Sequence, residues 1–191
     1  MDEIGVRDGN EACDEAIRRA NDHRAELFVW DGDGMGALLR RQVEQGVIKC
    51  DPRMYRGSES ADFPDSVPSY DDNRHQKTNK DLFTNKRAQY YTELAWRFHN
   101  TYKAVEKKQY IDPDDLISIS SSIKLINKLR AEVCRIPRKL NNVNGKIQIM
   151  PKEEMKRRHN INSPNMADCL AMALEKPLNR DKAANITFEG W

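Results

Sequence analysis

The start of the chain passes from a helical to a strand-like pattern of apolar positions. Residues 10–25 open with Asn10 as a helix-capping residue, and one face of this helix carries small and apolar side chains, namely Ala12, Ala16, Ile17 and Ala20. The stretch ELFVWD follows as a short apolar run that ends at Asp31, which is typical of a buried strand. We therefore expect a helix packed on a flat surface, followed by a buried strand.

The same order repeats in the residues that follow. The stretch GMGALLRRQVEQG predicts a second helix that ends at Gly46, and VIKCDPRMYRG predicts a second strand that leaves the core. Helix, strand, helix and strand in this order are typical of a layered domain whose strands pair in parallel. The pattern therefore predicts an α/β fold class.

Residues 57–81 differ from their surroundings because they are rich in Ser, Asp, Asn and Pro and poor in aliphatic side chains. This composition predicts a long, mobile excursion. A loop of this length inside a compact domain usually has a function or is disordered.

Two helical stripes come next. The stretch LFTNKRAQYYTELAWRFHNTYKAVEKK predicts a long amphipathic helix. Its apolar face consists of Tyr91, Leu94, Ala95, Phe98 and Tyr102. Asp112 and Pro113 then form a helix-start signal. The second stripe consists of Ile123, Ile126, Leu129 and Val133.

The last part of the chain predicts a hairpin and two helices. The hairpin turns at Asn144 and Gly145, with Ile147 and Ile149 facing inward. A short helix starts at Pro151, and the chain breaks at Ser163 and Pro164. The final helix carries apolar Met166, Leu170, Ala173 and Leu174. Residues 177–191 have the composition of a tail.

Composition and charge restrict the possible partners only weakly. Charged residues make up 32% of the chain and hydrophobic residues 38%, yet the net charge is only +2. No global field therefore indicates a nucleic-acid or membrane partner. No apolar run approaches the roughly 20 residues that span a bilayer, and residues 1–20 are too acidic for a secretory signal. We expect a soluble intracellular protein without a membrane partner.

The cysteines and aromatic residues have structural interpretations. The chain contains no CxxC pair, so we expect reduced, buried thiols rather than a disulfide framework or a zinc site. The four cysteines are Cys13, Cys50, Cys134 and Cys169. We expect core or interface positions, rather than base-stacking platforms, for Trp30, Trp96, Tyr90 and Tyr91.

Two aspartates are the candidate chemical groups. Asp31 ends an apolar strand, and its ionised side chain cannot be buried without a partner or a cation. Asp168 interrupts the small, apolar stretch NMADCLAMAL of the last predicted helix. Carboxylates that meet at a sheet edge are oxygen ligands suited to Mg²⁺ or Mn²⁺. The alternative is structural, with Asp31 as a turn residue and Asp168 at the positive end of a helix dipole.

Basic residues cluster ahead of Asp168, in RIPRK and in the stretch that follows it. This cluster predicts contacts with a phosphate backbone, which position a nucleic acid without reading its sequence. A solvated helix face is the alternative interpretation of KEEMKRR. The candidate residues are Lys146, Lys152, Lys156, Arg157 and Arg158.

Five blocks of sequence together resemble the nuclease domain of the large terminase subunit of tailed bacteriophages, the DNA-packaging motor. The resemblance runs from about residue 10 to residue 176, and the order and spacing of the blocks are more specific than any one of them. The blocks are FVWDGDGMGA, FTNKRAQYYTELAWRF, DPDDLISIS, GKIQIMPKEEMKRR and SPNMADCLAMA.

The resemblance implies a ribonuclease H-like fold over 1–176 and metal-dependent cleavage of concatemeric double-stranded DNA during genome packaging. It implies a site for two Mg²⁺ or Mn²⁺ ions. It also implies a protein of the host cytoplasm whose partners are the terminase ATPase domain, the small terminase subunit and the portal protein. Asp31 matches the acidic residue at the end of the central strand, and Gly34 and Gly36 match its glycines. Asp168 matches the acidic residue of the last helix.

The sequence departs from the family pattern at two places. Asn165 stands where the block of the last helix usually has its first acid, so it offers an oxygen without a charge, and Asp33 and Asn165 become auxiliary ligands. The family's first catalytic aspartate lies on an opening strand ahead of residue 10, where MDEIGVRDGN has no buried-strand pattern. We therefore expect the first strands of the fold to be missing, as in a fragment or split-gene product. Because a catalytic carboxylate is then missing too, we expect weak or no cleavage of DNA.

Two other functions stay open. A catalytically silent docking module would bind DNA or a portal or procapsid partner through residues 57–81, and its salt-sensitive binding would survive removal of metal. A junction resolvase or an integrase would share the carboxylate geometry but act on branched or viral-end DNA.

Overall fold

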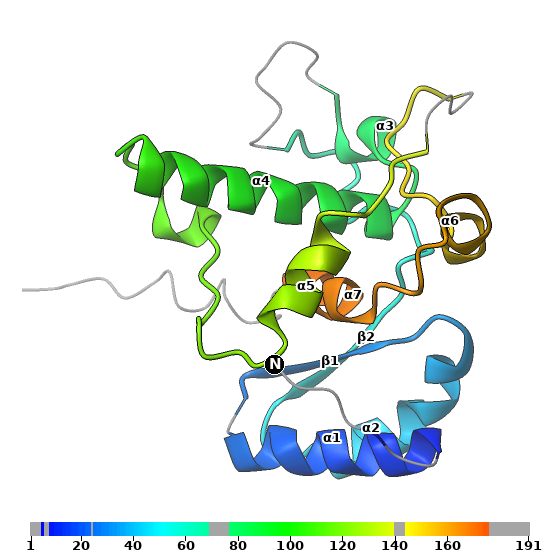
Figure 1. Ribbon diagram of the computed structural model, residues 1–191. Coiled ribbons are helices and arrows are strands. Elements are labelled where there is room, and N and C mark those ends of the chain that lie inside the picture. Colours follow the sequence, from blue (N-terminus) through cyan, green and yellow to red (C-terminus); the bar gives the residue numbers. More distant parts are fainter. Residues whose placement is uncertain (1–4, 6–7, 24, 69–76, 140–143, 176–191) are drawn as a thin grey trace, which may run out of the picture. The chain divides into compact units, whose positions relative to one another are not determined.

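The computed structural model describes residues 5, 8–23, 25–68, 77–139 and 144–175 (Figure 1). The chain divides into two compact units, with a boundary between Tyr55 and Arg56. The first unit contains the strands, and the second contains most of the helices. The expected tail, 177–191, lies outside the described residues, and the single domain expected over 1–176 stays a prediction.

The first unit is built around a parallel pair of strands, β1 (Leu27–Asp31) and β2 (Asp51–Tyr55). Leu27 pairs with Asp51, and the register continues to the pair Asp31 and Tyr55. A parallel pair needs a crossover between its strands. Here η1 (Gly34–Leu39) and α2 (Arg40–Gly46) supply it, so the predicted parallel α/β arrangement is confirmed.

The helix α1 (Gly9–His23) packs against α2 and buries a small core. The core consists of Cys13, Ile17, Val43 and Val47. Phe28 and Trp30 of β1 pack against this core from the sheet, together with Leu39 and Cys50. The apolar face of α1 and the side chains of the strand therefore meet as the sequence pattern predicts.

Three expectations for this unit need correction. The helix α1 begins at Gly9, and Asp8, not Asn10, caps it by accepting the backbone N–H of Glu11 at 2.9 Å. The strand β1 is half-buried rather than buried. The predicted second helix is a tighter 3₁₀ turn in its first half. Gly36 of this turn approaches the chain closely, since a Cβ there would lie 1.6 Å from the Asp31 carbonyl oxygen.

The second unit is mainly helical. The long helix α4 forms its centre, and α7 packs against α4 and α5. The largest fully buried side chains of this unit include Phe83, Leu94, Leu129 and Met155. Its helices are α3 (Asn79–Leu82), α4 (Lys86–Glu106), η2 (Pro113–Asp115), α5 (Ile126–Val133), α6 (Lys152–His159) and α7 (Asn165–Met172).

The N-terminus of α4 is fixed by the chain that follows β2. A helix leaves its first backbone N–H groups without partners inside the helix. Here the carbonyl oxygens of Glu59 and Gly57 accept the N–H groups of Lys86 and Arg87 at 2.8 and 2.9 Å. The side chain of Asn85 accepts the Ala88 N–H at 3.0 Å. The first turn of α4 therefore has a defined position in this unit.

The described ends of the excursion predicted over 57–81 are more regular than expected. Asn79 begins the helix α3, and its side chain donates to the carbonyl oxygens of Asp62 and Phe63 at 2.9 and 3.0 Å. The structured ends follow from these backbone hydrogen bonds, which a polar composition does not reveal. Residues 69–76 lie outside the described residues.

The long helix is confirmed, but its apolar face is narrower than predicted. Leu94 is buried, whereas Ala95 and Tyr102 are exposed. The helix-start signal at Asp112 and Pro113 produces only the three-residue turn η2, because Ile117 donates its backbone N–H to the Thr101 side chain instead of continuing the turn. The second stripe becomes helical only from Ile126 onward.

The predicted hairpin is present at its described ends. Arg138 and Ile149 form an antiparallel bridge, and Lys139 donates its backbone N–H to Gln148 at 2.8 Å. Gly145 adopts a positive φ of 64°, which glycine tolerates. Ile149 is buried, whereas Ile147 is only half-buried. Residues 140–143 lie outside the described residues.

Two further expectations concern the thiols and the membrane. The four cysteines are thiols rather than disulfides, but of these only Cys13 is buried, while Cys134 and Cys169 are exposed. Burial raises the pKa of the Cys13 thiol above its ordinary value, and the nearby charge of Asp14 adds to this effect. Over the described parts of the chain, no helix combines the length and the apolar character needed to cross a bilayer.

Candidate functional site: a compensated carboxylate on α7

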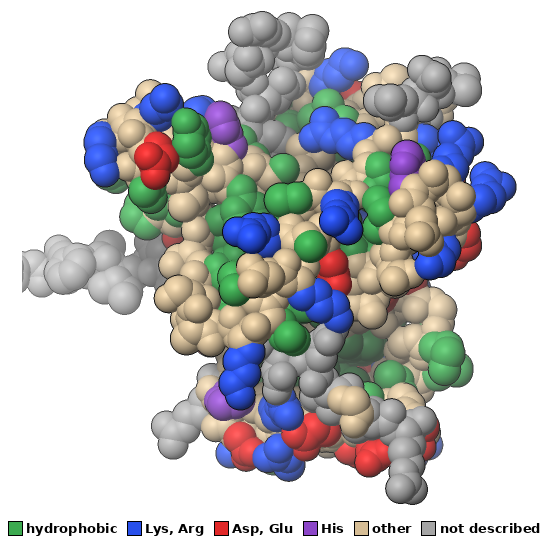
Figure 2. All heavy atoms as spheres, in the orientation of Figure 1, with side chains coloured by type: hydrophobic (Ala, Val, Ile, Leu, Met, Phe, Trp, Pro, Cys, Tyr) green, Lys and Arg blue, Asp and Glu red, His purple; other side chains and the backbone are tan. Residues whose placement is uncertain are grey.

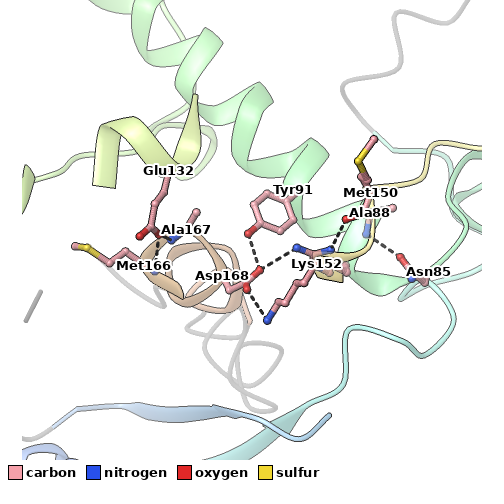
Figure 3. A network of polar contacts seen from close by, with 10 residues as sticks. Asn85, Ala88, Tyr91, Glu132, Met150, Lys152, Met166, Ala167 and Asp168 are labelled. Atoms are coloured by element: carbon pink, nitrogen blue, oxygen red, sulfur yellow. Dashed lines mark hydrogen bonds and ion pairs between the residues drawn. The ribbon is translucent and has the colours of Figure 1, made fainter. Parts of the chain in front are cut away.

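Asp168 lies in the first turn of α7, where two other helices of the second unit bring three donors to its carboxylate (Figure 3). Tyr91 and Arg87 come from α4, and Lys152 is the first residue of α6. The Asp168 side chain is 14% exposed. An ionised carboxylate at this depth needs charged or hydrogen-bonding partners, and these three residues supply them.

The two carboxylate oxygens of Asp168 have different partners. Tyr91 donates its hydroxyl to Oδ1 at 2.6 Å, and Arg87 donates Nη2 to the same oxygen at 3.4 Å. Lys152 places Nζ 2.9 Å from Oδ2. This contact is an ion pair without hydrogen-bond alignment, and Oδ2 is a buried oxygen that accepts no hydrogen bond from the described residues.

Arg87 and Tyr91 form a rigid pair one helical turn apart on α4. The Arg87 guanidinium lies 5.2 Å from the centre of the Tyr91 ring, and its Nη1 donates to the Met150 carbonyl oxygen at 3.2 Å. Burial, together with the negative charge of Asp168, raises the pKa of Tyr91 well above its usual range. The phenol therefore stays protonated and is a permanent donor to the carboxylate.

Glu132 on α5 fixes the start of α7. Its Oε2 accepts the backbone N–H groups of Met166 and Ala167 at 2.8 and 3.1 Å (Figure 3). A carboxylate at this position satisfies N–H groups that have no partner in the helix and interacts favourably with the helix dipole. Glu132 therefore determines where the turn that carries Asp168 begins.

Asp31 ends β1 in the first unit, where it is exposed and held by a tight loop. Its Oδ1 accepts the Asp33 backbone N–H at 2.9 Å. Gly34 has a φ of 62°, and Trp30 donates its indole N–H to the Gly36 carbonyl oxygen at 3.2 Å. Gly34 adopts the positive φ, and Gly36 lacks the Cβ that would collide with the Asp31 backbone. The two glycines therefore allow the tight loop that holds the strand-end carboxylate.

The predicted auxiliary ligands and basic residues lie at the surface or contact other protein groups. Asp33 and Asn165 are both exposed, and Asn165 is the first residue of α7. Three basic side chains contact protein groups: Lys146 donates to the Lys80 carbonyl oxygen, Lys156 donates to Asn162 and Arg158 pairs with Glu154. Lys and Arg side chains gather on the surface around α6 (Figure 2).

The site can bind a cation only by reorganising its charges. Carboxylate oxygens suit hard divalent ions. Within the described ranges, no three His, Cys, Asp or Glu residues form a group that could hold a metal ion. Asp168 instead has cationic neighbours, and a cation at Oδ2 would take the place of the Lys152 ammonium group.

Sequence reasoning missed Arg87, Tyr91 and Glu132 as parts of the site. The aromatic residue was correctly expected to be buried, at 7% exposure, but its hydroxyl partner lies 77 residues further along the chain. The four-residue spacing of Arg87 and Tyr91 was a usable signal, because residues at this spacing share a helix face. No comparable local signal marks Glu132.

Comparison with solved structures relates the chain to viral DNA-packaging proteins. The nuclease domain of the large terminase subunit gp2 of bacterial virus Sf6 matches with a TM-score of 0.81 and 42% identity. The match covers 90% of this chain and 74% of that chain. A lysine-to-alanine variant of the same domain, solved with manganese and beta-thujaplicinol, matches with a TM-score of 0.82 and 41% identity over the same shares of the two chains.

A further structure of the Sf6 protein, a lysine-to-alanine variant with calcium, matches with a TM-score of 0.81 and 42% identity. It also covers 90% of this chain and 74% of that chain. No protein-family model and no curated protein sequence matches.

The fold and these matches define the class of the chain as a nuclease domain with a ribonuclease H-like α/β fold. The chain belongs to the family of nuclease domains of bacteriophage large terminase subunits. This confirms the resemblance carried by the five sequence blocks.

Proposed function

We propose that the chain is a metal-dependent endonuclease that cleaves concatemeric double-stranded viral DNA during genome packaging. Asp31 and Asp168 are the proposed ligands of Mg²⁺ or Mn²⁺, with Asp33 and Asn165 as auxiliary ligands. The observation that carries the proposal is the buried Oδ2 of Asp168, which accepts no aligned hydrogen bond from the described residues. The manganese and calcium named for the Sf6 structures support it.

The donor set fits a hard divalent ion. Both carboxylates and the Asn165 amide supply oxygen ligands, which Mg²⁺ and Mn²⁺ prefer. When bound, such ions would supply Lewis acidity for hydrolysis of a phosphodiester. The Asp31 side chain is exposed at its strand end, whereas Oδ2 of Asp168 is paired with Lys152, whose side chain is 39% exposed.

The residues of the chain itself have distinct proposed roles. Asp31 and Asp168 hold charge, and Lys152 neutralises Asp168 when no cation is present. The basic residues around α6 hold the phosphate backbone of DNA without reading its sequence. Besides Lys152, they are Lys146, Lys156, Arg157 and Arg158. DNA binding should weaken steeply with salt, because each neutralised phosphate releases counterions.

The further partners and the compartment follow from family membership alone and are part of the proposal. They are the terminase ATPase domain, the small terminase subunit and the portal protein, in the cytoplasm of the host. Pull-down of the 191-residue chain with each purified partner tests them.

A plasmid-cleavage assay with Mn²⁺ tests the activity. Cleavage of supercoiled plasmid by the chain should be weak, as the sequence predicts, and Asp31→Ala and Asp168→Ala should both abolish what cleavage there is. Asp65→Ala is the matched control, because its side chain is 80% exposed and pairs with Lys80 at the surface. Cleavage that persists unchanged in both ligand variants would refute the assignment.

A docking module is the second candidate, because the charge of Asp168 is balanced by Arg87 and Lys152 as in a structural carboxylate. It predicts DNA or portal binding that survives chelation of metal. Isothermal titration with Mn²⁺ separates the two functions. Heat that disappears in Asp168→Asn supports the nuclease, and salt-sensitive DNA binding without any such heat supports the docking module.

A further inference from the structure

The helix α4 holds two aspartates in the same way from consecutive positions. In each case a basic residue and a tyrosine four residues later contact the same carboxylate. The charged group of the basic residue lies 5.2 Å from the centre of the tyrosine ring in both sets. One set holds Asp62 through Lys86 and Tyr90, and the other holds Asp168 through Arg87 and Tyr91. Of the two carboxylates, only Asp168 is a proposed metal ligand.

We propose that Tyr91, braced by Arg87, is a positioning residue for Asp168 that directs Oδ2 toward the divalent cation. This inference rests on the proposed function. Tyr91 holds Oδ1, so the carboxylate offers one oxygen rather than both. The tyrosine does not touch the substrate or the cation and acts only through Asp168.

The different partners of the two Asp168 carboxylate oxygens support this role. An ionised carboxylate only accepts hydrogen bonds, and the Tyr91 hydroxyl occupies Oδ1 at 2.6 Å (Figure 3). Rotation of the Asp168 side chain would break this short bond. Among the described residues, the other oxygen, Oδ2, accepts no hydrogen bond and is paired with Lys152, whose side chain is partly exposed.

The contacts that fix Tyr91 and Arg87 in place also support the positioning role. Tyr91 is 7% exposed and lies in the second turn of α4. Arg87 is fixed at three points, by its backbone bond to Gly57, by Nη1 on Met150 and by the ring beneath it. A donor held in this way fixes ligand orientation, as partners of metal-binding carboxylates generally do.

Tyr91→Phe tests the inference, with Tyr90→Phe as the matched control. Both substitutions remove one buried hydroxyl from the same helix, and both hydroxyls donate to a carboxylate, at 2.6 and 2.8 Å. Isothermal titration and the electron paramagnetic resonance signal of free Mn²⁺ measure binding to the 191-residue chain. Thermal unfolding without metal measures the structural effect separately.

We expect Tyr91→Phe to bind Mn²⁺ about 10- to 100-fold more weakly, with Tyr90→Phe binding as the parent does. Plasmid cleavage by Tyr91→Phe should recover when the Mn²⁺ concentration is raised, with no change in the DNA concentration needed for half-maximal rate. A merely structural tyrosine would lose activity without this recovery. Arg87→Lys, which keeps the charge but not the planar fork, should show a smaller loss of the same kind.

The outcomes separate the inference from the function. Loss of Mn²⁺ binding in Asp168→Asn, with parent-like binding in Tyr91→Phe, would overturn the positioning role and leave the nuclease standing. Equal weakening in Tyr91→Phe and Tyr90→Phe would also overturn it. Parent-like Mn²⁺ binding in Asp168→Asn would refute the metal site itself, and the role of Tyr91 with it.

Discussion

Removal of the Glu132 carboxylate should loosen the helix that carries Asp168. In Glu132→Ala, the backbone N–H groups of Met166 and Ala167 lose the acceptor that lies 2.8 and 3.1 Å away. A hydrogen bond to a charged acceptor contributes about 1.5–3 kcal/mol, and part of the loss is recovered because water reaches the first turn. We expect a loss of about 3 kcal/mol in the free energy of unfolding of this unit.

Glu132→Gln separates the two contributions. The amide oxygen of the glutamine can still accept the N–H groups. The substitution removes the negative charge, whose interaction with the helix dipole contributes about 0.3–1 kcal/mol near a surface. The glutamine variant should therefore lose about 1 kcal/mol, clearly less than the alanine variant. Glu106→Ala, an exposed glutamate at the end of α4, is the control and should change stability little.

Thermal unfolding and amide hydrogen exchange measure these effects. A loss of about 3 kcal/mol lowers the melting temperature by about 6–12 °C for a chain of this size. Exchange should accelerate locally at the amides of Met166 and Ala167 before any global change. Equal stability of Glu132→Ala and Glu106→Ala, or unchanged exchange at the two amides, would refute the capping role.

Three further predictions follow from individual side chains. Lys152→Met should bind Mn²⁺ about fivefold more tightly, because a partly exposed ion pair worth about 1 kcal/mol no longer has to break; weaker binding in a titration would contradict this. In native protein, Cys134 and Cys169 should react with a thiol reagent before Cys13, which is buried and whose pKa is raised; a first modification at Cys13, detected by mass spectrometry, would contradict it. Burial raises the pKa of Tyr91 above its ordinary value of 10, so the unfolded chain loses this proton first and the protein loses stability as pH rises above about 10. The stability advantage of the parent over the phenylalanine variant should therefore shrink in that range in urea unfolding, and a constant difference would count against the shifted pKa.

Local periodicity was sufficient to predict the main elements. The strand β1, the crossover and β2 follow from short apolar runs bounded by Gly and Asp, and α4 follows from its long four-residue spacing. The same spacing placed Tyr102 in the core, where the structure has it half-exposed. Periodicity gives the direction of a side chain on its helix but not whether another element covers that part of the helix.

The site was predictable only where a single residue carries the signal. Asp168 interrupts a small, apolar stripe, and this irregularity is visible in the sequence. Its partners Arg87 and Tyr91 lie 81 and 77 residues away, and they meet it because α4 and α7 pack together. The regular ends of the excursion predicted over 57–81 were not visible in the sequence for a related reason, since Gly57 and Glu59 accept N–H groups of the distant helix α4.

Asp62, the second aspartate that α4 contacts, shows why a compensated carboxylate is not by itself a metal ligand. Tyr90 and Lys86 both contact Oδ2 of Asp62, at 2.8 and 3.1 Å, and the Lys86 side chain is only 11% exposed. A lysine held so deeply cannot leave without an unpaired buried charge, which costs several kcal/mol. The lysine beside Asp168 is more than three times as exposed, and the oxygen that it contacts accepts no hydrogen bond from the described residues. Equivalent chemistry on one helix therefore gives a buried pair at Asp62 and a more exposed one at Asp168, where our proposal requires the lysine to give way to a cation.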